Sequence, residues 1–139
     1  MNRTLLIAIS VVSFLLCALA GTDGANRAKR STREGNGKLR ALALAPEKAR
    51  VSMNPYEGQP DAIRAGSKLF RQHCAECHGE DGRGLGRAAD LRSLGVQNAT
   101  PGELEWLLRN GNLSKGMPSW SGFPPQRRWQ IVTYVKSLR

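Results

Sequence analysis

The sequence lacks the features that build several common classes of protein. It has no apolar run of the roughly 18 residues that a membrane-spanning helix needs, and no segment in which apolar and polar residues alternate long enough for a β-strand. At 139 residues it is too short for a large multidomain enzyme, and aromatic residues occupy only 6% of its positions. It therefore predicts one small all-α domain with little apolar material for a core.

Acidic residues are scarce as well, with 11 Asp and Glu against 21 Lys and Arg, which gives a net charge of +10. Residues 1–20 contribute +1 of this excess, residues 21–51 contribute +5 and residues 52–139 contribute +4. Half of the positive charge thus lies in a polar, glycine-rich stretch that cannot form a core. We therefore do not expect a nucleic-acid-binding domain.

Residues 1–20 have the pattern of a secretory signal peptide. Arg3 precedes an apolar run over 5–19, and the Ala-Leu-Ala sequence that ends at residue 20 fits a cleavage site. An uncleaved membrane anchor is the alternative. Cleavage would remove Cys17 and leave two cysteines in the exported chain, which we expect to be periplasmic or exported and membrane-associated.

Residues 21–54 are predicted to form a flexible basic tether, because they show no sustained helical or strand period. Their cations could attract an anionic membrane surface or an acidic partner, although a solvated linker is the simpler interpretation.

Residues 55–139 are predicted to fold. One helix is expected from Pro60 into the cysteine pair, with Ile63 and Phe70 on its buried face. A second helix should begin at a capping box of Thr100 and Glu103. A third follows Pro124-Pro125, with a buried stripe of Trp129, Val132, Val135 or Lys136, and Leu138, and with Ile131 and Tyr134 alongside. Long glycine-rich loops join three short helices, so the domain needs a disulfide, a metal or a cofactor to complete its core.

The sequence Cys74-Ala75-Glu76-Cys77-His78 supplies that missing part, because Cys-x-x-Cys-His is the pattern of covalent haem attachment. On a helix the two cysteines and the histidine lie three and four positions apart, on one side. Two thiols so placed can add to the two vinyl groups of one haem, while the imidazole reaches the iron.

Two other uses of this motif fit the sequence less well, and chance occurrence of the pattern is a third alternative. A redox-active disulfide normally opens a helix that follows a strand, and no strand is predicted here. A zinc site needs four ligands, but His73 and the three motif residues are crowded into six positions without a second half.

With this motif, the chain resembles class I c-type cytochromes, monohaem electron carriers of the bacterial periplasm or membrane surface. The resemblance covers about residues 60–139 and is carried by the segments 65–70, 74–79, 116–118 and 129–138. It implies an all-α class I cytochrome c fold, with three main short helices and long loops around one covalently attached haem c. Cys74 and Cys77 would carry the thioethers, and His78 would bind the iron.

The resemblance also implies how the domain packs. In the family the first and last helices cross at a small residue beside an aromatic pair, for which Gly66, Phe70 and Tyr134 are the candidates. A carbonyl after the motif accepts a hydrogen bond from the iron-binding histidine. The family often has a proline next to that carbonyl; residues 86–91 have alanine there, which leaves open which carbonyl accepts the bond.

The second axial ligand must come from elsewhere in the chain. His73 adjoins the motif and cannot reach the opposite face, Met53 lies in the expected tether, and Lys115 is a weaker ligand. Met117 lies between Gly116 and Pro118, in a sequence that resembles the ligand loop of the family. We therefore expect His78 and Met117 to bind the haem iron, although a gap-filling methionine is the simpler alternative.

The function that follows is electron transfer by a haem iron that cycles between the ferric and ferrous states, without enzymatic activity of its own. Redox partner proteins would supply and accept the electron in a periplasmic or membrane-surface respiratory chain. Two alternatives stay open: a cytochrome c subunit of a larger dehydrogenase or terminal oxidase, and a haem-free thiol oxidoreductase.

Overall fold

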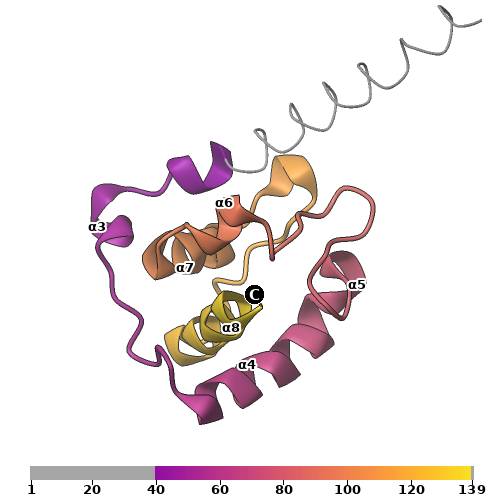
Figure 1. Ribbon diagram of the computed structural model, residues 1–139. Helices are drawn as coiled ribbons and strands as arrows, with labels where there is room; N and C mark the ends of the chain where they lie inside the picture. The colour runs from indigo at the N-terminus through magenta and orange to yellow at the C-terminus, as the bar shows by residue number, and fades with distance from the viewer. Residues whose placement is uncertain (1–39, 139) are drawn as a thin grey trace, which may run out of the picture. The chain divides into compact units, whose positions relative to one another are not determined.

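Three helices form the centre of the computed structural model, which describes residues 40–138. They are α4 (Pro60–His73), α7 (Pro101–Asn110) and α8 (Pro125–Ser137), and α8 packs against both of the others. Figure 1 shows α8 between α4 and α7, with α5 continuing from the end of α4. The described residues contain no strand, only an isolated antiparallel bridge between Asn112 and Met117. The predicted all-α class is confirmed.

Four short elements accompany these helices. They are α3 (Glu47–Arg50), α5 (Ala75–His78), α6 (Leu94–Gln97) and the 3₁₀-helix η1 (Leu113–Lys115). In the part of the chain that the structure describes, no helix combines the length and the apolar content needed to cross a membrane.

The core is a single cluster of buried apolar side chains. Phe70, Ile131 and Val132 are its most completely buried large side chains. The other members of the cluster are Leu42, Ala75, Val96, Ala99, Leu104, Leu108 and Val135. Every one of the three central helices contributes, so the cluster joins segments far apart in the sequence.

The crossing of α4 and α8 occurs at Gly66, as the resemblance implied. A Cβ atom at Gly66 would lie 2.0 Å from the carbonyl oxygen of Gln130, so only glycine permits this approach. Four residues further along α4, the ring of Phe70 meets that of Tyr134 with centroids 5.2 Å apart. The expected aromatic pair is therefore present.

Two details of the predicted helix faces were wrong. On α4 the most buried position of the first turn is Ala62, and Ile63 is half-buried beside it. The fully buried residues of α4 are Ala62, Gly66 and Phe70, and the close approach to α8 is at Gly66. On α8, Ile131 is central to the core rather than alongside it.

Residues 40–54 were expected to belong to the flexible tether, but they are folded as a strap, a name used below for this segment. A helical turn over residues 40–43 and then α3 run along the outside of the domain to the start of α4 (Figure 1). Leu42 is buried in the core, and the Asn54 amide donates to Thr133 Oγ1 over 2.8 Å. The signal peptide (1–20) and the rest of the tether (21–39) lie outside the described residues.

Candidate haem site

The attachment motif lies where α4 ends and α5 begins. Cys74 caps the end of α4 with φ −121° and ψ −32°, which interrupts the helix. Its carbonyl oxygen still accepts hydrogen bonds from the backbone N–H groups of Cys77 (3.1 Å) and His78 (2.9 Å). The predicted continuous helix is thus two helices, but the motif residues remain together on one turn.

The two cysteines are free thiols, with Cys74 half-buried and Cys77 exposed. Burial raises the pKa of the Cys74 thiol to about 11, and the neighbouring Cys77 adds to the effect. A redox-active cysteine needs a lowered pKa, because the thiolate is the reactive form. The environment of Cys74 therefore does not activate this thiol as a nucleophile.

A backbone carbonyl orients the imidazole of His78. Its Nδ1 atom lies 3.0 Å from the carbonyl oxygen of Ala89. Because a carbonyl only accepts, Nδ1 must carry the proton, and Nε2 keeps the lone pair that can bind iron. The acceptor that the sequence left open is therefore Ala89, one of the two alanines of segment 86–91.

Met117 comes from a different part of the chain and is held by its backbone. Its N–H donates to the Asn112 carbonyl over 3.1 Å, and its own carbonyl accepts from the Asn112 N–H over 2.9 Å. The two hydrogen bonds close the loop that contains η1. The half-buried side chains of Met117 and Cys74 both pack against the core cluster. The structure therefore brings the candidate ligand loop to the same core as the attachment motif.

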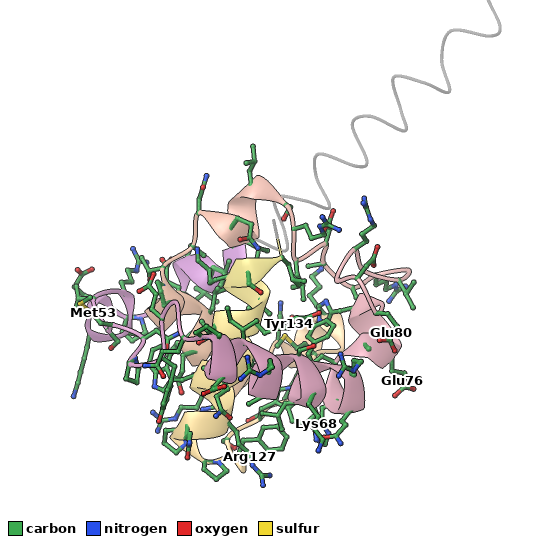
Figure 2. The ribbon with its side chains drawn as sticks, turned by 60° about the horizontal axis from the view of Figure 1, so that its bottom comes forward. Met53, Lys68, Glu76, Glu80, Arg127 and Tyr134 are labelled. Atoms are coloured by element: carbon green, nitrogen blue, oxygen red, sulfur yellow. The ribbon has the colours of Figure 1, made fainter. Side chains whose placement is uncertain are left out.

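Met53, the other candidate methionine for the second axial position, lies away from this site. Its side chain is 81% exposed, and Figure 2 shows it on the opposite side of the domain from Glu76 and Glu80. The fold thus removes the competing thioether that the sequence contained.

Sequence reasoning missed an aromatic cluster beside the motif. The ring of His73 lies 5.6 Å from that of Trp120 and 5.1 Å from that of Phe123, between ring centroids. The cluster links the end of α4 to the loop that follows Met117. Trp120 and Phe123 lie about fifty positions after His73 in the sequence, so no local signal could have predicted their contact with it.

The donor set fits a haem better than a metal ion held by the protein alone. Within residues 40–138 no group of three or more His, Cys, Asp or Glu side chains is placed to hold a metal ion. One imidazole, one soft thioether and two thiols outside any disulfide match the needs of a porphyrin that brings its own four nitrogen ligands.

The helical fold and this motif define a class I c-type cytochrome, an electron carrier that contains covalently bound haem c. More specifically, the chain belongs to the family whose model is described as "Cytochrome C oxidase, cbb3-type, subunit III", which matches residues 61–135.

Two relatives support this family assignment. The chain is 33% identical to cytochrome c550 of Pseudomonas aeruginosa over 91 residues, which are 60% of this chain and 61% of that protein. It is 32% identical to the quinohemoprotein alcohol dehydrogenase ADH IIB of Pseudomonas putida over 106 residues, or 75% of this chain. The chain spans only 15% of that dehydrogenase.

A solved structure shows the same fold. Cytochrome CL from the marine methylotroph Methylophaga aminisulfidivorans superimposes with a TM-score of 0.55 over 69% of this chain and 71% of that chain. The two sequences are 22% identical, so this similarity concerns the fold alone.

Proposed function

We propose that Cys74 and Cys77 carry the haem through thioether bonds and that His78 Nε2 and Met117 Sδ are its axial ligands. The bound haem supplies one-electron chemistry between ferric and ferrous iron. The observation that supports this ligand set best is the 3.0 Å contact between His78 Nδ1 and the Ala89 carbonyl, because it makes Nδ1 the proton-bearing nitrogen and Nε2 the nitrogen with the donor lone pair.

The residues of the chain set the properties of the carrier. The Ala89 carbonyl increases the basicity of His78, which favours ferric iron, while the thioether of Met117 favours ferrous iron. With both axial positions filled by protein side chains, no substrate reaches the iron. The chain then passes single electrons between a donor and an acceptor protein and catalyses no reaction of its own.

The proposed site of action is outside the cytoplasmic membrane. Support comes from the signal-like sequence of residues 1–20. The eight cations of residues 21–51 would favour an anionic membrane surface.

Replacement of Met117 by Ala is the direct test of the ligand set. The full chain is produced in a host that attaches c-type haem, and a denaturing gel stained for haem peroxidase activity first establishes covalent attachment. The wild type should show the weak iron–sulfur band of a methionine-ligated ferric haem. Met117→Ala should lose that band, and its ferrous form should bind carbon monoxide because one axial position is open.

Met53→Ala is the matched control, because it removes the exposed methionine on the far side of the domain. It should keep both the band and the resistance to carbon monoxide. A ferrous spectrum that is unchanged in Met117→Ala would show that this sulfur is not a ligand.

A second candidate function is that of a cytochrome module within a larger redox assembly. Two observations favour it: the description of the matching family model and the 32% identity to a segment of a quinohemoprotein alcohol dehydrogenase. Purification of the tagged chain from its native membranes and periplasm distinguishes the two. A stoichiometric flavin, quinone or copper partner supports the module, whereas a haem protein recovered alone supports the free carrier.

A further inference from the structure

We infer that Gly84 and Gly111 are positioning residues, each of which helps to place one axial ligand. Each glycine allows two backbone segments to approach so closely that a Cβ atom would not fit between them. The inference rests on the proposed function, because it concerns the supports of His78 and Met117. It assigns to two glycines, which contribute no side chain, a role in the electronic properties of the haem.

Gly84 contacts both His78 and the group that orients it. Its N–H donates to the His78 carbonyl over 2.7 Å. A Cβ atom on Gly84 would lie 2.6 Å from the Ala88 carbonyl oxygen and 2.9 Å from the carbonyl carbon and oxygen of Ala89. These are backbone atoms that cannot rotate away. A side chain at position 84 must therefore displace the carbonyl that accepts the His78 hydrogen bond.

The displacement has a predictable sign. When Nδ1–H donates to a carbonyl, the imidazole becomes a stronger donor through Nε2 and stabilises ferric iron. A longer or bent hydrogen bond weakens this effect. The reduction potential should therefore rise when Gly84 is replaced, while the bond to Met117 is retained.

Gly111 has the equivalent position beneath the Met117 loop. It ends α7 with φ +73°, and a Cβ atom there would lie 2.7 Å from Pro118 C and from Ser119 N. Pro118 directly follows Met117, and Asn112, the neighbour of Gly111, forms the two hydrogen bonds to Met117. A side chain at position 111 would therefore push the returning segment outward and move the thioether away from the iron.

The same loops contain a matched control for each glycine. Gly86 (φ +55°) and Gly116 (φ +85°) also have positive φ, but a Cβ atom at either would meet nothing within 4 Å. Replacement by Ala strains the backbone at all four positions, because all four have positive φ. Of the four, only Gly84 and Gly111 would crowd the ligand support. Gly111 has ψ −174°, which restricts it to glycine more strictly than the left-handed conformation of Gly116 with ψ 4°. The comparison for Gly111 therefore also uses the double variant with Ser119→Gly, which relaxes the opposing segment while the strain at position 111 remains.

The experiment uses the haem-loaded full chain with single Gly→Ala substitutions. Gly84→Ala should raise the midpoint potential, and NMR of the ferrous protein should show the His78 Nδ1 proton exchanging about tenfold faster, as expected for loss of one neutral hydrogen bond. Gly86→Ala should match the wild type in both measurements. Gly111→Ala should lose the ferric iron–sulfur band and bind carbon monoxide, whereas Gly116→Ala should do neither.

Equal behaviour within a pair overturns the inference for that ligand. If Gly84→Ala yields no haem-loaded protein, this substitution is combined with Ala88→Gly, which gives the opposing backbone more freedom to move. A midpoint potential of the double variant equal to that of Ala88→Gly alone then overturns the inference for His78. Gly111→Ala is combined with Ser119→Gly in the same way. If the wild type itself lacks His/Met spectra, the proposed ligand set is wrong, so that failure is distinct from failure of the glycine variants.

Discussion

Two adjacent arginines at the start of α8 have opposite environments. Arg127 is exposed, with its guanidinium 5.9 Å from the ring centroid of Phe123. Arg128 is buried, and its Nε donates to Glu105 Oε1 over 2.7 Å. Arg128 also donates to the Phe123 carbonyl, so it ties the loop after Met117 to α7 and α8.

We expect Arg128→Ala to lower the free energy of unfolding by about 3–5 kcal/mol, because it leaves the Glu105 carboxylate largely buried without its partner. Arg127→Ala should cost about 1 kcal/mol or less, since an exposed cation–π contact contributes no more. Urea unfolding of the two haem-loaded variants measures both values. Equal losses would show that the buried ion pair makes no special contribution.

The sequence could predict residues whose role is set by their near neighbours. The attachment motif and the Thr100 capping box, in which Thr100 Oγ1 accepts from the Glu103 N–H over 3.2 Å, are such cases. Ala89 and Arg128 are the opposite case. Ala89 acts through a backbone carbonyl that every residue has, and Arg128 acts through partners brought together only by the fold.

At the scale of elements, the crossing of α4 and α8 depends on one missing side chain. Gly66→Ala would place a Cβ atom 2.0 Å from the Gln130 carbonyl oxygen, so the two helices must separate. We expect a loss of about 1–3 kcal/mol in the free energy of unfolding. Gly122→Ala is the control, because a Cβ atom there meets nothing within 4 Å. Denaturant titration of both variants tests this, and a wild-type midpoint for Gly66→Ala would contradict it.

The existence and order of the three central helices were predictable, because proline starts, caps and apolar spacing are local signals. Their exact buried faces were not. Ile63 is the larger apolar residue, yet Ala62 is the one that is fully buried. Hydrophobicity alone cannot show how near the partner helix lies.

At the scale of the whole molecule, the folded unit begins earlier in the chain than its composition suggested. The strap has scattered small apolar residues without a period, so its sequence looked like a linker. Leu42 is nevertheless 6% exposed within the core, whereas Leu44 is 72% exposed. The strap also packs closely on α7: a Cβ atom at Gly102 would lie 1.8 Å from the carbonyl oxygen of Ala49.

Leu42→Ala should therefore lower the free energy of unfolding of the haem-loaded protein by about 2–4 kcal/mol, through lost burial and the cavity that remains. Leu44→Ala makes the same chemical change two residues away and should alter the free energy of unfolding by no more than about 0.5 kcal/mol. Chemical denaturation monitored by circular dichroism compares them. If both variants unfold like the wild type, the strap contributes nothing to the stability of the domain.

The bridge between Asn112 and Met117 has a practical consequence. Two backbone hydrogen bonds fix the ends of a four-residue turn, and the side chains of residues 113–115 are exposed. Ser114 Oγ donates to Asn112 Oδ1, whereas the side chain of Leu113 is 76% exposed. A fluorophore or spin probe grafted at Leu113 would report on encounters beside the proposed redox centre while the thioether stays where the fold has placed it.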